Sequence, residues 1–237
     1  MLPPDNPLTR MVGVLAPSTR PFHVETPGTR QRRRYGVALT LAIGTLLLAL
    51  ALGTSPGDHR FYPLTIALAC SWLVGAAVSG PLHLGRWTLQ RGDDEHGRRD
   101  LLLPAALAVA AFAVFVAGDL LFQQVPVLAR QLTEIISRAD TGGKPLVVFV
   151  ALLNGVAEEV FFRGALYSAF GPHRPALWST VAYTVATAFT GNLALVVAGA
   201  AMGTLFAVER RATRGVLASA ITHVVWSVLV IAFLPRP

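Results

Sequence analysis

Two glutamates and an arginine lie within one long apolar stretch of this chain. They are Glu158, Glu159 and Arg163, in the segment NGVAEEVFFRGAL. An ionisable side chain near the middle of a membrane-spanning helix costs roughly 2.5 to 3.5 kcal/mol on insertion scales. A helix that only had to cross a bilayer would carry leucine or valine at these positions. A carboxylate in a water-poor cavity, kept ionised by an arginine, can take a proton from water. The three residues therefore predict chemistry inside the membrane.

The spacing of these residues predicts different partners for the two glutamates. Glu159 and Arg163 are four residues apart, so they share one face of a helix and can form an ion pair. Glu158 points about 100° away from Glu159 around the helix axis and cannot serve the same arginine equally well. We therefore expect Glu158 to face a cavity and Glu159 to be held by Arg163. A purely structural ion pair is the alternative, but it leaves Glu158 unexplained.

A histidine is expected at a matching depth in the last apolar segment. At ~1.5 Å per residue, the two glutamates lie about 15 Å from the inner end of their helix, and His223 lies about 10 Å from the start of its own helix. The groups can therefore meet in one polar cavity that opens toward the cytoplasmic half of the bilayer. The alternative for His223 is a packing role, with a hydrogen bond to a neighbouring helix.

Composition and the order of apolar segments predict an all-α integral membrane protein with a polar site inside a helical bundle. Of the 237 residues, 53% are hydrophobic and 14% are charged, against roughly 25% charged in soluble domains. Residues 1–35 are expected to be a disordered basic tail, followed by a transmembrane domain over 36–236 with its functional core at 145–234. Several apolar runs match the ~20 residues that span a bilayer. About seven helices are predicted, at residues 36–54, 62–80, 101–122, 145–169, 176–190, 193–208 and 216–234.

The basic residues indicate the orientation of the chain and the kind of partner. The net charge is +7, but the arginines fall between the apolar segments and do not gather on one folded face, so no nucleic acid is expected to bind. Most of them lie in the tail and in the loops that share its side. By the positive-inside rule this predicts a multi-pass cell-membrane protein with a cytoplasmic N-terminus and an outer C-terminus. The expected partners are membrane lipid and a peptide or membrane-protein substrate.

Two segments resemble a known family. AEEVFFRGALY is similar to the EExxxR motif of the CAAX-prenyl-protease and bacteriocin-processing family of intramembrane proteases, also called the abortive-infection family. RRATRGVLASAITHVVW resembles the segment that leads to the last catalytic histidine of that family, here His223. The resemblance covers roughly residues 145–230. It implies that Glu158 activates the attacking water or ligates a metal, that Glu159 and Arg163 support it, and that His223 helps to hold the developing oxyanion.

The chain departs from that family at two positions. The family usually carries a middle FxxxH motif, but here Phe189 is followed four residues later by Leu193. Ser227 stands four residues after His223, where the family tends to have Asn or Asp. Serine can still donate one hydrogen bond, so we expect Ser227 to assist His223.

The missing histidine affects both the expected lining of the cavity and the expected cofactor. We expect one or more of Thr187, Thr190 and Asn192 to line the cavity and bond Glu158 or the water, with Tyr183 as a less favoured candidate. A catalytic zinc normally keeps three protein ligands, and Glu158 with His223 provides too few. The prediction is therefore no cofactor, or a single zinc held by these two residues.

The leading hypothesis is an intramembrane endopeptidase that hydrolyses a peptide bond near the cytoplasmic half of the bilayer, with Glu158 as the base on water. The alternative is a catalytically silent family member acting as a membrane scaffold or an immunity or binding protein, which the missing histidine favours. A transporter is a third possibility because buried carboxylates also mark proton paths, but the sequence shows no inverted repeat.

Overall fold

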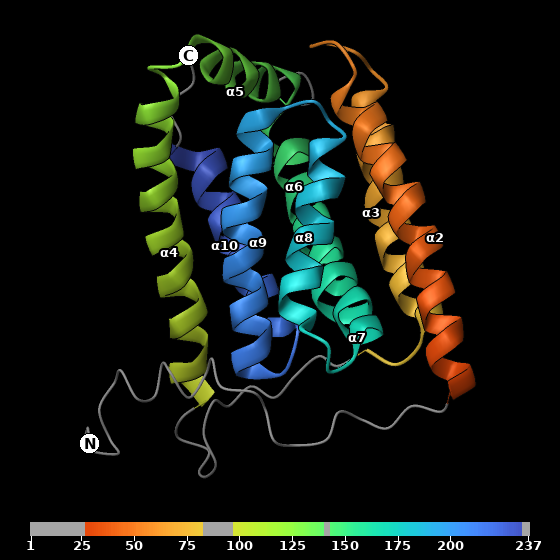
Figure 1. Ribbon diagram of the computed structural model, residues 1–237. Helices are drawn as coiled ribbons and strands as arrows, with labels where there is room; N and C mark the ends of the chain where they lie inside the picture. Colours follow the sequence, from red (N-terminus) through yellow and green to blue (C-terminus); the bar gives the residue numbers. More distant parts are fainter. Residues whose placement is uncertain (1–26, 83–96, 140–142, 234–237) are drawn as a thin grey trace.

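The structure is a computed structural model that describes residues 27–82, 97–139 and 143–233. Within these ranges every regular element is a helix, which confirms the predicted all-α class (Figure 1). The elements are α2 (Pro27–Leu52), α3 (Phe61–Ser79), α4 (Gly97–Phe122), α5 (Pro126–Ala139), α6 (Lys144–Glu158), the π-helix η3 (Glu159–Leu166), α7 (Tyr167–Phe170), α8 (Pro175–Ala188), α9 (Leu193–Thr213) and α10 (Leu217–Phe233).

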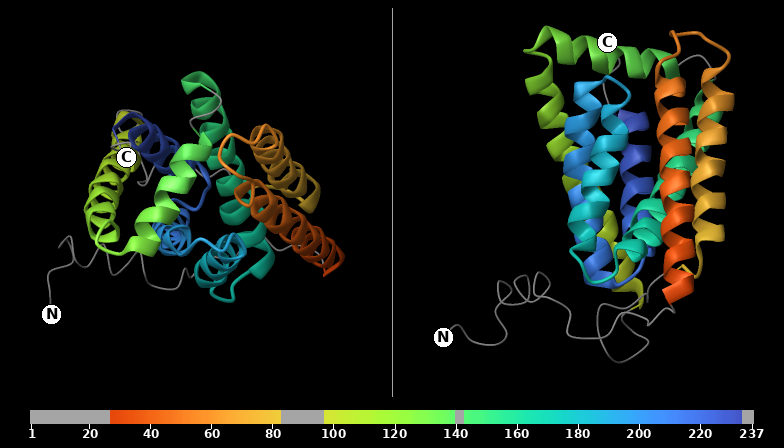
Figure 2. Two further views of the ribbon diagram at one scale, coloured as in Figure 1. Left: turned by 90° about the horizontal axis from the view of Figure 1, so that it is seen from above. Right: turned by 45° about the vertical axis from the view of Figure 1, so that its right-hand side comes forward.

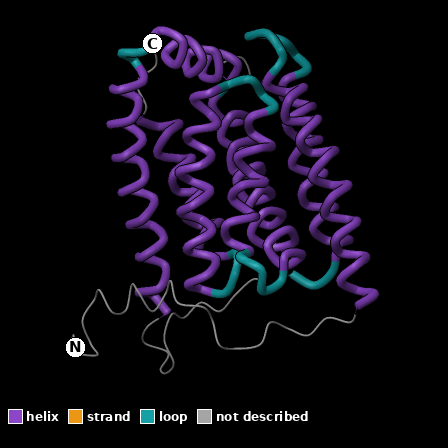
Figure 3. The backbone as a smooth tube through the Cα atoms, viewed as in Figure 1, coloured by secondary structure: helices purple, strands orange, loops and turns teal. Residues whose placement is uncertain are grey.

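The helices form an upright bundle, and one short helix lies across an end of it. In the described part of the chain, five segments are long and apolar enough to span a membrane, at Gly28–Leu52, Phe61–Ser79, Leu102–Phe122, Lys144–Phe170 and Leu193–Thr213. The shorter apolar α10 and the 14-residue α8 stand beside them, which agrees with the predicted count of about seven (Figures 1 and 3). Helix α5 runs across the end at which α4 finishes and α6 begins (Figure 2). The chain is a multi-pass membrane protein.

The core of the bundle is built around the π-helix. Trp72 of α3 is almost completely buried and packs its ring on Phe161 and Phe162, with ring centroids 4.5 and 5.1 Å away. Helix α2 can approach this tryptophan because Gly44 has no side chain, and a Cβ there would lie only 2.1 Å from the indole. The α2–α3 hairpin therefore holds one face of η3.

The first helix begins earlier than predicted. Helix α2 starts at Pro27 rather than at residue 36, so the predicted disorder of the tail is wrong for residues 27–35, and the rest of that tail lies outside the described residues. The physical reason is that two arginines in this part of α2 donate hydrogen bonds to the backbone of other segments. Arg33 is fully buried and donates to the carbonyl of Pro81 at 3.1 Å, and Arg34 donates to that of Ala169 at 3.4 Å.

The α5 helix was not predicted, because its sequence is amphipathic and too polar to read as a membrane span. Gln131 fixes it to the α8–α9 hairpin. Its side-chain oxygen accepts from the amides of Leu193 and Ala194, at 2.9 and 3.3 Å, and its amide group donates to the carbonyl of Gly191 at 3.3 Å. Asn192 caps α9 by accepting from the Leu195 amide at 2.9 Å. The backbone groups freed at this turn are therefore satisfied by side chains.

Candidate active site

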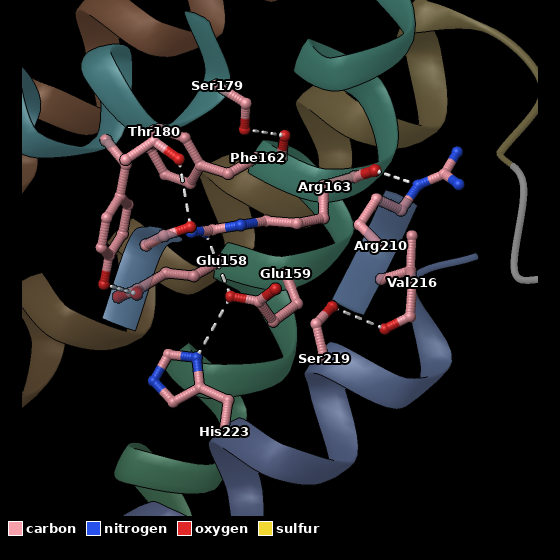
Figure 4. Close-up of polar contacts among 12 residues, drawn as sticks. Glu158, Glu159, Phe162, Arg163, Ser179, Thr180, Arg210, Val216, Ser219 and His223 are labelled. Atoms are coloured by element: carbon pink, nitrogen blue, oxygen red, sulfur yellow. Dashed lines mark hydrogen bonds and ion pairs between the residues drawn. The ribbon is translucent and has the colours of Figure 1, made fainter. Parts of the chain in front are cut away.

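The two glutamates lie where a regular α-helix changes into a π-helix. Glu158 ends α6 and Glu159 begins η3 (Figure 4). π-helical segments are rare and are frequently found at functional sites. Side chains from two other helices stabilise this one. Ser179 of α8 donates to the carbonyl of Phe162, and Arg210 of α9 donates through Nε to the carbonyl of Arg163, each at 2.7 Å.

The predicted ion pair between Glu159 and Arg163 is present. Both side chains are completely buried, and Arg163 donates through Nη1 to Oε1 of Glu159 at 3.1 Å. The same oxygen lies 3.4 Å from Nδ1 of His223. One carboxylate therefore joins a cation on its own helix to an imidazole on α10, and it neutralises the arginine in a region without solvent.

The arginine is also held by α9. Its Nη2 donates to the carbonyl of Gly203 at 2.9 Å, and its guanidinium carbon lies 4.8 Å from the ring centroid of Tyr183. A Cβ at residue 203 would come within 3.1 Å of Tyr183 and 3.3 Å of Arg163. One at Gly199 would meet Thr187 at 3.3 Å, so Gly199 and Gly203 form a close-packing face of α9.

Glu158 has a different environment from its neighbour, as its position on the helix predicted. It is partly exposed, whereas Glu159 is fully buried. The hydroxyl of Tyr183 on α8 donates to Oε2 of Glu158 at 2.7 Å. The residue that supports Glu158 is therefore the less favoured candidate of the sequence analysis.

The three preferred candidates bond elsewhere. The hydroxyl of Thr187 donates to the backbone carbonyl of Tyr183, that of Thr190 donates to the carbonyl of Thr187, and Asn192 caps α9. Within the described part of the chain they make no hydrogen bond to Glu158, because a threonine in a helix readily satisfies its hydroxyl on the preceding turn. That one of them bonds the attacking water stays a prediction. The longer tyrosine side chain crosses from α8 to α6.

His223 lies between α6, η3 and α9. Its ring stacks on Phe206 with centroids 4.7 Å apart, and it lies against Gly155 of α6. Its second ring nitrogen points to the side on which the Glu158 carboxylate lies in the view of Figure 4. Ser227 is buried one turn further along α10, and its assistance to His223 stays a prediction.

The donor set does not fit a catalytic zinc. Among the residues that the structure describes, no three or more His, Cys, Asp or Glu side chains are grouped so that they could hold a metal ion. One oxygen of Glu159 already faces Arg163 and His223, and Glu158 is bonded by Tyr183. A third ligand of the kind that zinc requires is missing from this set.

Two further charged residues near the site, Glu209 and Arg210, were not predicted. They are only 5% and 6% exposed. Besides its bond to the Arg163 carbonyl, Arg210 lies over the ring of Tyr167, 4.8 Å from its centroid. The available signal was their position within one turn of the apolar residues Phe206 and Ala207.

The segment that carries these groups matches a known family. Residues 142–229 match the family model described as type II CAAX prenyl endopeptidase Rce1-like. This segment is similar to the Rce1-like family. The match begins just before α6, ends within α10 and includes both glutamates, Arg163 and His223. It confirms the resemblance predicted for residues 145–230. No curated protein and no solved structure matches the chain.

Proposed function

We propose that this protein is an intramembrane endopeptidase of the Rce1-like type, in which Glu158 activates the attacking water. The observation that carries the proposal is the arrangement of the two glutamates. A partly exposed Glu158 is oriented by Tyr183, and beside it Glu159 joins Arg163 to His223 in a buried cluster. The Rce1-like match over the same residues supports a protease. The proposed substrate is a prenylated peptide that ends in a CAAX sequence.

Glu158 is the proposed general base. Tyr183 donates to Oε2, which leaves Oε1 to accept a proton from a water molecule. The water oxygen then forms a bond to the carbonyl carbon of the substrate, and the carbonyl oxygen becomes an oxyanion. When the carbon–nitrogen bond breaks, protonated Glu158 returns its proton to the leaving amine. The products are a carboxylic acid and an amine, and water is the only reactant besides the peptide.

His223 is the proposed oxyanion donor. With an Nδ1–H directed at Glu159, the ring is fixed in orientation. The protonated ring then presents Nε2–H to the developing oxyanion. Arg163 balances the charge of Glu159, so the carboxylate can serve His223 without remaining an uncompensated buried anion.

The test is cleavage of a farnesylated CAAX peptide by purified protein in lipid vesicles. Wild-type protein should release the C-terminal tripeptide, and Glu158→Gln should lower the rate about 100-fold or more, the contribution typical of a general base. Glu134→Gln on α5 is the matched control and should cleave at the wild-type rate. Full activity of the Glu158→Gln protein would overturn the proposed mechanism.

A second candidate function is a catalytically silent binding protein. The observation that favours it is the donor set, which lacks the third metal ligand and satisfies one oxygen of Glu158 with tyrosine. Such a protein would bind the farnesylated peptide and leave it intact, and Glu158→Gln would bind as tightly as wild type. The same vesicle experiment separates the two functions when bound and cleaved peptide are both measured.

A further inference from the structure

The second buried carboxyl group, that of Glu209, has no part in the proposed reaction. It lies on α9, and its Oε1 is 2.6 Å from the hydroxyl oxygen of Thr222 on α10. Its Oε2 is buried and has no hydrogen-bond partner among the residues that the structure describes. The Thr222 side chain is fully buried, and its hydroxyl also lies 3.1 Å from the backbone carbonyl of Pro104 on α4. Three helices therefore meet at one hydroxyl group.

The number of protons available at this junction indicates whether Glu209 is ionised. A threonine hydroxyl carries one proton, whereas an ionised carboxylate and a carbonyl can only accept. If Glu209 were ionised, Thr222 could donate to the carboxylate or to Pro104, but not to both. If Glu209 is protonated, it donates to Thr222 and Thr222 donates to Pro104, so both contacts are hydrogen bonds.

The surrounding charges also favour the neutral acid. The charged groups of the described chain that act on Glu209 are Glu159 and Arg163, which are already paired with each other. The adjacent Arg210 points away, toward the Arg163 carbonyl and the Tyr167 ring. A buried carboxylate without its own cation is costly, and protonation removes that cost.

This junction is coupled to His223 through the geometry of two helices. Phe206 and Glu209 are three residues apart on α9, so they present one face to α10. Phe206 stacks on His223, and Glu209 contacts the preceding residue, Thr222. Consecutive residues point about 100° apart around a helix. Fixing Thr222 against α9 and α4 therefore fixes the rotation of α10 and the direction of the His223 ring.

We propose that Glu209 is a neutral carboxylic acid that positions His223, through hydrogen bonds that run from α9 by way of Thr222 to the Pro104 carbonyl. The part of this proposal that concerns catalysis rests on the proposed function. The protonation of Glu209 and the orientation of His223 can each be measured without any cleavage.

Infrared spectroscopy of the full-length protein in lipid vesicles at neutral pH tests the protonation. Wild-type protein should show the carbonyl stretch of a protonated carboxyl group. Glu209→Gln should lose that band, and Glu134→Gln should keep it. A wild-type spectrum from which Glu209→Gln removes no such band would overturn the proposal.

Ring-nitrogen NMR of His223 tests the positioning, with its signals assigned by their loss in His223→Asn. The signals should shift in Thr222→Val, which removes both hydrogen bonds, and return toward wild type in Thr222→Ser. Glu209→Gln should leave them in place, because an amide can still donate to Thr222. Unchanged signals in Thr222→Val, in a protein that keeps its helical circular dichroism, would refute the positioning role.

Cleavage then separates this proposal from the proposed function. Glu209→Ala and Thr222→Val should each cleave about tenfold more slowly, the effect of about one lost hydrogen bond in the transition state. Glu209→Gln should stay close to the wild-type rate. Equal losses in Glu209→Gln and Glu209→Ala would overturn the neutral-acid role. A wild-type protein that cleaves nothing would refute the proposed function, while the spectra still decide the role of Glu209.

Discussion

Glu158 and Glu159 are neighbours in the sequence but occupy sites of different chemistry. Glu158 is partly exposed and has a neutral hydroxyl donor, whereas Glu159 is completely buried and faces a cation and an imidazole. The difference follows from the turn of about 100° between consecutive helical residues. Because Glu158 is the proposed base and Glu159 holds Arg163 and His223, the same substitution should have different consequences at the two positions.

The first prediction compares Glu158→Gln with Glu159→Gln. Glu158→Gln should abolish cleavage and leave thermal stability nearly unchanged, because the amide oxygen can still accept from Tyr183. Glu159→Gln should destabilise the protein by about 3–5 kcal/mol, since it leaves the buried Arg163 without its counter-ion. Thermal unfolding in detergent, followed alongside cleavage, checks both. Equal loss of stability in the two variants would contradict the division of roles.

A second prediction concerns Tyr183. Removing its hydroxyl in Tyr183→Phe should lower the cleavage rate about tenfold, since Glu158 loses the donor that orients it. Stability should change little because the ring keeps its place over Arg163. The control is Tyr35→Phe, whose side chain is 69% exposed on α2. If Tyr183→Phe cleaves as fast as this control, Tyr183 does not orient the base.

Metal removal provides a third prediction, again at the scale of single residues. Cleavage should resist chelators, and the purified protein should contain no stoichiometric zinc, because Glu158 and His223 provide fewer than the three protein ligands that a catalytic zinc normally keeps. Metal analysis and cleavage in the presence of a chelator check this. Stoichiometric metal that disappears in His223→Ala, together with chelator-sensitive cleavage, would show a conventional metalloprotease.

At the scale of elements, the site depends on the close approach of α8 and α9. The carbonyl of Gly203 accepts from Thr180 at 3.1 Å and from Arg163 at 2.9 Å. Gly203 therefore contributes in two ways: the lack of a side chain lets the helices approach, and its carbonyl accepts hydrogen bonds from side chains. The same approach brings Tyr183 over the guanidinium of Arg163. Any residue that moves α9 outward should therefore affect stability and catalysis together.

The fourth prediction is that Gly203→Ala destabilises the protein by about 1–3 kcal/mol, the usual cost of overpacking a close contact. Cleavage should fall with it, because the new Cβ meets Tyr183 and Arg163. Gly118→Ala on α4 is the matched control, because a Cβ there meets nothing within 4 Å. That control should be neutral or slightly stabilising, since alanine favours a helix by about 1 kcal/mol over glycine. Similar unfolding temperatures for the two variants would contradict the packing role.

Long apolar elements and charge pairs within a helix were predictable, because each depends on residues close in the sequence. The run predicted at 62–80 is α3 within one residue, and the Glu159–Arg163 pair follows from a spacing of four. The rotation of each helix about its own axis, and the neighbours against which each helix packs, were not predictable. Counting residues gave Thr187 the depth of Glu158 but not the direction in which it points. Glu209 was misjudged because its partners come from α10 and α4.

For the whole molecule, the predicted orientation assigns one end of the bundle to the cytoplasm. The starts of α2 and α4 lie at the same end of the bundle as the connection from α9 to α10, and α5 lies at the opposite end (Figure 1). Arg30, Arg32 and Arg34 lie at the start of α2, and Arg211 and Arg214 lie at the turn between α9 and α10. By the positive-inside rule, we expect this end to face the cytoplasm.

The fifth prediction tests that orientation. A reporter fused after Glu95 should be active on the cytoplasmic side, and one fused after Pro237 should be active on the outer side, because an odd number of crossings follows residue 95. Phosphatase and fluorescent-protein fusions report opposite sides and serve as controls for each other. Finding both positions on one side of the membrane would rule out the seven-helix topology.

The π-helix also has a consequence for changes in chain length. It packs more residues into each turn than an α-helix, so removing one residue from Glu159–Leu166 would let the segment close into regular α-helix. The wide turn accommodates the extra residue, so the helices before and after such a deletion would keep nearly the same relative orientation. The same deletion in the regular part of α6 would turn everything beyond it by about 100°. A one-residue deletion within Glu159–Leu166 that spares Glu159 and Arg163 should therefore be less damaging than a one-residue deletion in α6.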